Sequence, residues 1–267
     1  MAKSPNTPPA VTPVERIYAL DGGIAEVADV SIYAPGIDVG KPASLSCNAY
    51  LIRRAGQWIL WDTGIADEMV HIPGGEIIAH GIRGVLKRTL KSQLDEIGVG
   101  PVDVATLLLS HAHFDHIGNV RLFPNAKWIV QREEHEAMFG PDHDDHGYDL
   151  AVYESLRDNP TEIVDGDHDV FGDGSIRLIY TPGHTPGHCS LAVRLPKSGT
   201  VILSGDVAHF ERNFIHRRVP GFNFDAGKTK ASMDKIDRII KAEKAQFWIN
   251  HDTEQSATIP HAPRWVE

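Results

Sequence analysis

The sequence predicts an α/β fold in which β-sheets are covered by helices. Strand-like and helix-like patterns alternate in both halves of the 267-residue chain, and no low-complexity linker separates the halves. Hydrophobic residues make up 42% of the chain, which is enough for a large core. We therefore expect a single α/β domain over residues 15–267. Residues 1–14 are rich in Pro and polar side chains, and we expect them to form a disordered tail.

Short apolar and aromatic runs mark the predicted strands of the first half. Residues 48–52 and 58–61 are β-type runs, and the Gly-containing segment 53–57 between them predicts a hairpin turn. Residues 104–109 form a continuous apolar run, which is typical of a strand buried on both faces. Residues 127–130 predict a further strand.

Two helices are predicted in the same half. Between residues 81 and 97 the apolar positions recur in steps of three and four, as expected for one face of a helix that ends before Gly98. These positions are Ile82, Val85, Leu86, Leu90, Leu94 and Ile97. Residues 132–139 form a charged helical stretch.

The second half repeats this alternation. Residues 176–180, 189–195 and 200–203 are strand-like. Residues 228–242 predict a helix with an apolar inner face, and residues 247–249 predict a last short strand.

The acidic charge balance excludes two classes of partner. The chain has 26 Lys and Arg against 36 Asp and Glu, a formal net charge of −10. Binding to nucleic acid or to an anionic membrane through phosphate groups needs a basic face, so we expect neither partner. No run approaches the roughly 18 apolar residues of a transmembrane helix.

Cys47 and Cys189 are the two cysteines of the chain. Both lie in apolar, strand-like segments, so we expect buried thiols rather than metal ligands, nucleophiles or a disulfide framework. The N-terminal segment lacks the apolar core of a secretory signal. We therefore expect the protein in the reducing cytoplasm.

The segment Ser110–His116 carries the strongest chemical signal. Its sequence is S-H-A-H-F-D-H, and it directly follows a predicted buried strand. Imidazole and carboxylate groups are ligands of borderline metal ions such as zinc. In an extended turn His111 and His113 point the same way. Asp115 and His116 then address a neighbouring point, so the segment suits two adjacent metal ions better than one.

Three further candidate ligands follow predicted strands. His184 lies in the segment T-P-G-H-T-P-G-H, Asp206 in S-G-D, and His251 in N-H-D. The glycines before His184 and Asp206 permit tight turns and a close approach of the backbone to an ion. A carboxylate at the position of Asp206 can bridge two cations and reduce their mutual repulsion.

The combined order H-x-H-x-D-H, G-H, G-D and C-terminal His resembles the ligand order of the metallo-β-lactamase superfamily. The resemblance extends from about residue 48 to residue 251 and implies an αβ/βα four-layer sandwich with two central β-sheets flanked by helices. It assigns one metal ion to His111, His113 and His184, a second ion to Asp115, His116 and His251, and a bridging position to Asp206. In the segment W-D-T-G it also implies that Asp62 orients the ligand loop, although an ordinary turn residue is the alternative.

Within the superfamily, the chain is most similar to the quorum-quenching N-acyl homoserine lactonases. Asp206 argues against a true β-lactamase, and the short stretch after His251 against the C-terminal helical domain of glyoxalase II. The acidic charge disfavours the RNA-processing branch, and the absence of a flavodoxin-like extension disfavours the flavo-diiron branch. The compact lactonases match in length, in the L-D-G-G segment over residues 20–23 and in N-H-D over residues 250–252.

This resemblance implies a hydrolase with two divalent metal ions, for which we expect Zn²⁺. A hydroxide held between the ions attacks the carbonyl carbon of a lactone, and Asp115 carries a proton to the ring oxygen that leaves. The expected substrate is an N-acyl homoserine lactone, as in quorum quenching. The alternative is another small lactone, an ester or a phosphotriester on the same metal centre. We expect a small-molecule partner and allow for a homodimer.

One departure from the lactonase pattern concerns His209. These lactonases usually carry a Tyr three residues after the bridging Asp, facing the substrate carbonyl, whereas Asp206 is followed by Val, Ala and His209. An imidazole can donate a hydrogen bond from a similar position, so His209 is a candidate catalytic residue. The alternative is a loop residue that does not touch the substrate.

Three more features have open interpretations. Residues 71–80 mix Gly, Pro and aliphatic side chains, and they predict either an apolar lip for an acyl chain or an ordinary connection. Residues 139–148 predict a solvated acidic loop rather than a further metal site. We expect His188 to be a structural residue beside the metal centre rather than a metal ligand.

Overall fold

The computed structural model describes residues 13–267, so most of the expected N-terminal tail lies outside the described residues. Val14 is already the first residue of strand β1. The strands are β1 (Val14–Val27), β2 (Ala43–Arg54), β3 (Gln57–Trp61), β4 (Glu76–Ala79), β5 (Ile82–Val85), β6 (Val104–Leu108), β7 (Lys127–Gln131), β8 (Thr161–Val164), β9 (His168–Asp169), β10 (Ile176–Tyr180), β11 (Cys189–Leu195), β12 (Gly199–Leu203) and β13 (Gln246–Trp248).

The helices are short apart from one near the C-terminus. The α-helices are α1 (Leu90–Glu96), α2 (Phe114–Ile117), α3 (Arg132–Phe139), α4 (Leu150–Tyr153), α5 (Glu211–His216), α6 (Ala226–Glu243) and α7 (Thr253–Ser256). The 3-10 helices are η1 (Val30–Tyr33), η2 (Asp67–His71), η3 (Pro101–Asp103), η4 (Val120–Leu122), η5 (His143–His146) and η6 (Glu154–Asp158). Within residues 13–267 no helix combines the length and apolar character that crossing a membrane demands.

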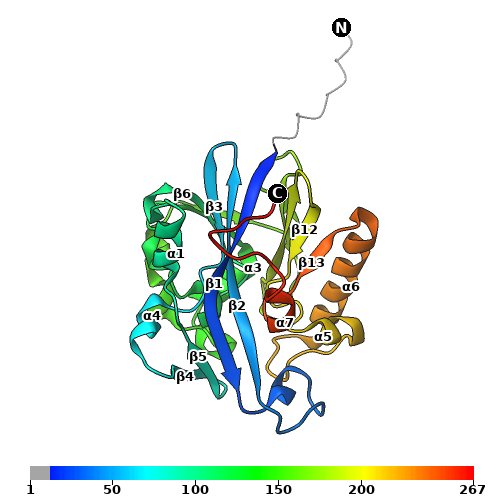
Figure 1. The fold of residues 1–267 in the computed structure, drawn as a ribbon. Coiled ribbons are helices and arrows are strands. Elements are labelled where there is room, and N and C mark those ends of the chain that lie inside the picture. Colours follow the sequence, from blue (N-terminus) through cyan, green and yellow to red (C-terminus); the bar gives the residue numbers. More distant parts are fainter. Residues whose placement is uncertain (1–12) are drawn as a thin grey trace.

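The strands form two sheets that face each other. One has eight strands in the order β4-β5-β1-β2-β3-β6-β7-β8, and the other has five in the order β13-β12-β11-β10-β9. Strands β3, β6, β7 and β8 run parallel, as do β12 and β13, whereas the other pairs are antiparallel. Figure 1 shows the helices on the outer sides of the two sheets, which confirms the expected four-layer sandwich.

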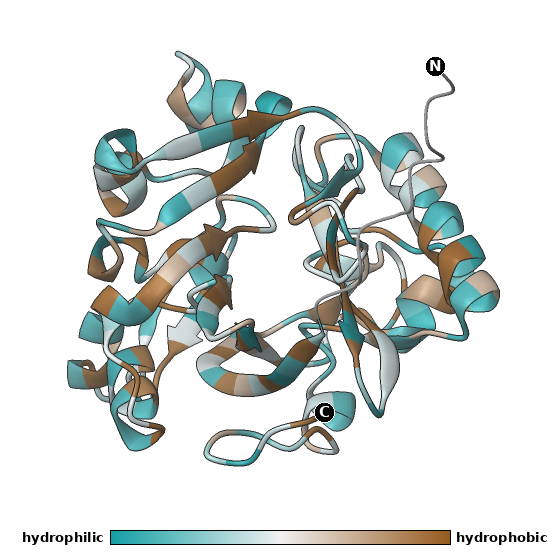
Figure 2. Ribbon diagram, turned by 90° about the horizontal axis from the view of Figure 1, so that it is seen from above, coloured by the Kyte–Doolittle hydropathy of each residue, from teal (hydrophilic) through white to brown (hydrophobic). Residues whose placement is uncertain are grey.

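Three apolar layers hold the sandwich together. Between the sheets, Ile59 and Leu108 of the larger sheet pack with Leu191 and Leu203 of the smaller one. Helices α1, α3 and α4 cover the outer face of the larger sheet, and α5 and α6 cover that of the smaller sheet. Figure 2 shows this layering from above, with helices of mixed hydrophilic and hydrophobic residues on the outer sides of the sheets. The buried faces explain why central strands such as β6 and β12 are rich in aliphatic residues.

Most predicted elements are confirmed, but the helix expected over residues 81–97 is wrong in its first half. Residues 82–85 form β5, which pairs with β4 and with β1, and only Leu90–Glu96 is helical. The tight turn at His80 and Gly81, both with positive φ, closes a β4–β5 hairpin and sets the chain direction. Helix α1 begins later because the Thr89 hydroxyl accepts from Ser92 N at 3.0 Å and caps it.

Strand β1 was not predicted, because the L-D-G-G segment interrupts its pattern. The register with β2 shifts between Asp21 and Ile24, so the glycines lie in a bulge inside the strand. A Cβ on Gly22 would lie 2.1 Å from the Cys47 carbonyl oxygen and 2.8 Å from the Gly64 Cα. The glycines therefore allow the turn after β3, which carries Asp62, to pack directly on β1.

Candidate metal centre

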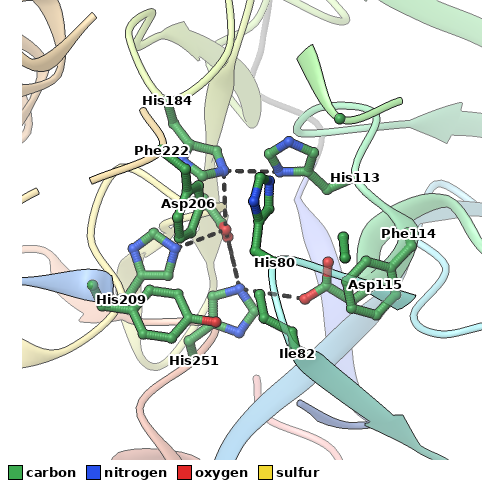
Figure 3. Close-up of a pocket in the computed structure, with 13 residues that line it drawn as sticks. His80, Ile82, His113, Phe114, Asp115, His184, Asp206, His209, Phe222 and His251 are labelled. Atoms are coloured by element: carbon green, nitrogen blue, oxygen red, sulfur yellow. Dashed lines mark hydrogen bonds and ion pairs between the residues drawn. The ribbon is translucent and has the colours of Figure 1, made fainter. Parts of the chain in front are cut away.

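The candidate ligands lie in loops that leave the carboxyl ends of strands from both sheets. On the side of the larger sheet, the loop after β6 carries His111 and His113, and the short helix α2 that follows carries Asp115 and His116. The smaller sheet contributes the other three, with His184 after β10, Asp206 after β12 and His251 after β13. Because β6 and these three strands end at one edge of the sandwich, residues far apart in sequence meet there (Figure 3).

The first cluster consists of His111, His113 and His184. The Nε2 of His111 lies 2.9 Å from the Nδ1 of His113, and the Nε2 of His184 lies 3.0 Å from the same atom. The Oδ2 of Asp206 is 3.3 Å from the Nε2 of His184. Three ring nitrogens and one carboxylate oxygen thus lie close enough together to surround one ion.

The second cluster consists of Asp115, His116 and His251. The Oδ1 of Asp206 lies 3.1 Å from the Nε2 atoms of both His116 and His251. The Oδ2 of Asp115 is 3.6 Å from the Nε2 of His251. Asp206 therefore stands between the clusters, with one oxygen near His184 and the other near His116. Figure 3 shows its carboxylate between His184 and His251.

In every histidine of the two clusters, the nitrogen that faces away from the centre has its own partner. The partners are the Ser110 Oγ for His111 (2.9 Å), the His146 carbonyl for His113 (3.0 Å), Asp62 Oδ2 for His116 (2.9 Å), Asn223 Oδ1 for His184 (3.0 Å) and the Ser46 carbonyl for His251 (2.8 Å). Where these partners accept the ring proton, the other nitrogen turns its lone pair toward the centre. Lone pairs about 3 Å apart repel one another unless a cation lies between them, so the residues fit two divalent metal ions.

The two clusters differ in the protonation that their surroundings favour. Burial lowers the pKa of His111 and His184 well below the usual value, and it lowers the pKa of His113 to about 4. These rings are neutral near pH 7 and ready to bind a metal.

In the second cluster the carboxylates outweigh burial. Burial alone would lower the pKa of His116 and His251, but the charges of Asp206 and Asp115 raise both above the usual value. Burial also opposes ionisation of Asp206, yet nearby His251 and His116 hold its pKa well below the usual range. Asp206 is therefore a carboxylate, as a bridging ligand needs to be.

Asp62, for which the sequence predicted an orienting role, contacts the start of the segment Ser110–His116 and one of its histidines. Its Oδ1 accepts from Ser110 N at 2.7 Å, and its Oδ2 accepts from the Ser110 hydroxyl at 2.9 Å. The same Oδ2 is 2.9 Å from the Nδ1 of His116. The side chain of Asp62 thus fixes both the start of the ligand loop and one of its histidines.

Glu134 of α3 is a buried residue of the site that sequence reasoning missed. Its carboxylate accepts from Ala112 N at 3.0 Å, from Gly187 N at 2.9 Å and from the Thr185 hydroxyl at 2.8 Å. It also accepts from the Tyr148 hydroxyl at 2.6 Å. Glu134 therefore joins the loop after β6 to the loop after β10. In the sequence it lies within an ordinary charged helix, so no local signal distinguishes it.

His188 and Cys47 lie beside the two clusters. The Nε2 of His188 accepts from Asp206 N at 2.7 Å, and so fixes the backbone of the bridging residue. The Cys47 thiol is fully buried, as expected, but it lies 3.5 Å from the Oδ2 of Asp115. Burial and then Asp115 raise the pKa of Cys47 well above its usual value, so the thiol is protonated in the metal-free protein. Its sulfur nevertheless lies close enough to donor atoms of Asp115 and His251 to share a cation with them.

His209 lies beside the bridging carboxylate. Its Nε2 is 3.1 Å from the Oδ2 of Asp206, and its ring stacks on His251 with centroids 5.1 Å apart. The other face of His209 contacts Tyr33, with centroids 4.7 Å apart. His209 lines the cavity of the centre, but its Nε2 is already engaged with Asp206.

The cavity above the clusters has an apolar wall. Ile82, Phe114 and Phe222 line it together with Ala79 and His80 from the tip of the β4–β5 hairpin (Figure 3). The His80 ring stacks on Phe222 at 5.0 Å, so the end of the segment 71–80 meets a loop of the other half. This part of the segment lines the cavity, as a lip for an acyl chain would.

The acidic segment 139–148 has a larger role than a solvated loop. Its Asp144 side chain is 86% exposed, as expected, but the His146 carbonyl orients His113. Asp142, Asp145 and His146 line a second cavity that adjoins the centre and shares His113 and His184 with it.

Comparisons with known proteins agree with this fold and site. The family model of the metallo-β-lactamase superfamily matches residues 44–244. The N-acyl homoserine lactonase AttM of Rhizobium radiobacter is 36% identical over 94% of this chain and 98% of its own. The structure of an N-acyl homoserine lactone hydrolase, with the product N-hexanoyl-L-homoserine at its catalytic metal centre, superposes with a TM-score of 0.83 and 29% identity, covering 95% of this chain and 100% of its own.

A more distant structure shares the fold. It is AidC, a dizinc quorum-quenching lactonase, with a TM-score of 0.66, 20% identity and coverage of 91% of this chain and 92% of its own. The chain belongs to the metallo-β-lactamase superfamily. Family, fold and donor geometry together make it a metal-dependent hydrolase.

Proposed function

We propose that this protein opens the lactone ring of N-acyl homoserine lactones. The observation that carries the proposal is the position of Asp206, which lies between two donor clusters and lines a cavity with an apolar wall. The similarity to AttM and to the hydrolase with bound N-hexanoyl-L-homoserine supports the substrate class. Ile82, Phe114 and Phe222 offer the apolar surface that an acyl chain needs.

The two clusters are the proposed ligand sets of two ions. We assign one ion to His111, His113 and His184, the other to Asp115, His116 and His251, and the bridging position to Asp206. Zinc is the proposed metal because the donors are imidazole nitrogens and carboxylate oxygens. When bound, such a pair of ions supplies a water of lowered pKa and a positive charge near the carbonyl oxygen.

Ring opening also requires the transfer of a proton. The oxygen of water bonds to the carbonyl carbon, the ring C–O bond breaks, and one proton of that water passes to the ring oxygen, which becomes an alcohol. The second proton goes to solvent as the new carboxyl group ionises. Asp115 is the proposed proton carrier, because its carboxylate lines the cavity and faces His251.

A comparison of two substrates with one metal-loaded preparation tests the proposal. The protein is loaded with two equivalents of zinc and assayed with N-hexanoyl homoserine lactone and with paraoxon. We expect N-hexanoyl homoserine to form, detected by mass spectrometry, at a kcat/KM well above that for paraoxon. His111→Ala serves as the control that lacks a donor of the first cluster. Cleavage of paraoxon without opening of N-hexanoyl homoserine lactone would favour the phosphotriester alternative.

Location and assembly complete the proposal. A cytoplasmic location is supported by the free, buried thiols of Cys47 and Cys189, which suit a reducing compartment. A homodimer is the assembly to test, and light scattering of the purified protein distinguishes it from a monomer.

A further inference from the structure

Tyr33 places an unused phenolic hydroxyl in the cavity of the metal centre. Its side chain is 3% exposed and lines the same cavity as Asp115, Asp206 and His251. Within residues 13–267 the hydroxyl forms no hydrogen bond, although the Tyr33 backbone does. A buried phenol usually has a polar partner, so this hydroxyl is available to a bound molecule.

The ring of Tyr33 is held firmly by residues from the other half of the molecule. The Tyr33 carbonyl accepts from Asn213 Nδ2 at 3.0 Å, and the neighbouring Ile32 carbonyl accepts from Gly221 N at 2.8 Å. Phe222 packs edge-on against the ring, with centroids 5.7 Å apart. In Figure 1 the connection between β1 and β2, which contains η1, reaches below α5. A donor fixed in this way needs little reorganisation when a substrate binds.

Tyr33 shares the cavity with the carboxylates of both clusters, Asp115 and Asp206. Burial, and then the charges of Asp115 and Asp206, raise the pKa of Tyr33 well above its usual value.

His209 is less suited to bind the substrate than its sequence position suggests. Its Nε2 is 3.1 Å from Asp206 Oδ2, and its Nδ1 is buried without a partner. The ring lies between Tyr33 and His251, which leaves little freedom to turn. A hydrogen bond from Nε2 to a substrate would require His209 to leave the bridging carboxylate.

We infer that Tyr33 is a catalytic residue that donates a hydrogen bond to the substrate carbonyl oxygen as that oxygen becomes negatively charged. His209 is then a positioning residue that holds Asp206. This inference rests on the proposed function for the identity of the substrate, but it concerns any ester whose carbonyl carbon is attacked in this cavity. Asp115 is the proposed proton carrier to the leaving oxygen, so Tyr33 and Asp115 act on different oxygens of the substrate.

The variant Tyr33→Phe tests the inference because it removes only the hydroxyl. The matched control is Tyr180→Phe, since the Tyr180 hydroxyl donates to Glu133 at 2.7 Å and does not line the cavity. Each zinc-loaded protein is assayed with N-hexanoyl homoserine lactone and with p-nitrophenyl acetate, an ester with a good leaving group. Zinc content and melting temperature are measured on the same samples.

We expect Tyr33→Phe to lower kcat about ten- to a hundredfold on both substrates, with KM, zinc content and melting temperature close to wild type. Tyr180→Phe should keep the wild-type kcat. The fold loss should be similar for the two substrates, because the carbonyl oxygen becomes negative in both reactions whatever the leaving group.

The other outcomes separate this inference from the proposed function. Lactone opening at the wild-type rate in Tyr33→Phe overturns the inference and leaves the function in place. A loss confined to the lactone assigns the hydroxyl to the leaving oxygen and also overturns it, as does a loss of zinc or a clear fall in melting temperature. Ester hydrolysis that depends on Tyr33, without lactone opening by the wild type, overturns the function alone. No turnover of either substrate by the wild type overturns both.

Discussion

The two donor clusters share Asp206 but differ in charge. The first consists of histidines that burial keeps neutral, and the uncharged Asn223 amide orients one of them. The second contains the Asp115 carboxylate, and a further carboxylate, Asp62, orients its His116. One centre can thus offer a neutral site, which binds a cation without losing protons, beside a negative site, in which the cation replaces protons.

Removal of the shared charge should have the largest effect. Asp206→Asn keeps the size of the side chain but leaves both clusters without the carboxylate between them. We expect less than one equivalent of zinc and a fall in kcat of about a thousandfold or more. Elemental analysis and lactone hydrolysis measure the two effects. Asp165→Asn, which changes an exposed partner of Arg132, is the control. If Asp206→Asn kept two equivalents of zinc and full activity, Asp206 would not be a ligand of the metal centre.

The next largest effect is expected from pH, because a lower pH should weaken zinc binding at the second cluster more than at the first. His116 and His251 have raised pKa values in the metal-free protein, so they hold protons that a cation must displace, and their affinity falls as pH falls. The pKa of His113 is about 4, so the first cluster stays neutral to lower pH. After dialysis at about pH 5.5 we expect about one equivalent of zinc, against two at about pH 7.5.

A variant of the second cluster identifies which ion is lost. His116→Gln should hold about one equivalent at both pH values, because only the first cluster remains intact. Simultaneous loss of both ions from the wild type at about pH 5.5 would contradict the difference between the clusters.

An exchange of the orienting residues should then reduce the difference. Asp62→Asn gives His116 an uncharged partner, and we expect the affinity of the second site for zinc to fall about ten- to a hundredfold. Asn223→Asp gives His184 a carboxylate partner, and we expect the first site to bind more tightly, by up to about tenfold. Competition with a chelator measures both affinities. Equal zinc affinities in the wild type and the variants would show that the charge of these partners does not influence metal binding.

The smallest effect is expected at His209. His209→Ala removes the Nε2 that faces Asp206, and we expect kcat to fall only several-fold, with zinc content unchanged. His209→Gln, which can still donate to the carboxylate, should recover most of the loss. If kcat fell further in His209→Ala than in Tyr33→Phe, and His209→Gln did not restore it, His209 would be the hydrogen-bond donor to the substrate. Steady-state kinetics of the variants side by side decides this.

The candidate ligands could be predicted from the sequence because their signal is local. Four of them lie within the single segment Ser110–His116, and the others follow strands with clear apolar patterns, such as β10. Their partners could not be predicted. Asn223 lies 39 residues from His184, and Ser46 lies 205 residues from His251, so only the folded chain brings them together.

The same distinction holds for the fold. Helix α6 and strand β11 follow regular patterns and were predicted nearly residue by residue. The region of β4 and β5 was not, because its direction depends on a two-residue turn and on pairing with the distant β1. Apolar spacing alone cannot distinguish a short hairpin followed by a helix from one longer helix.

The origin of the ligands in both sheets has a consequence for the life of the protein in a cell. His113 comes from the larger sheet and His184, 71 residues later, from the smaller one. An ion held by both would cross-link the two halves, and it binds the folded chain far better than the unfolded one. Metal starvation would then expose the chain to proteases by raising the population of opened molecules. The amount of this protein in a cell would follow the supply of its metal.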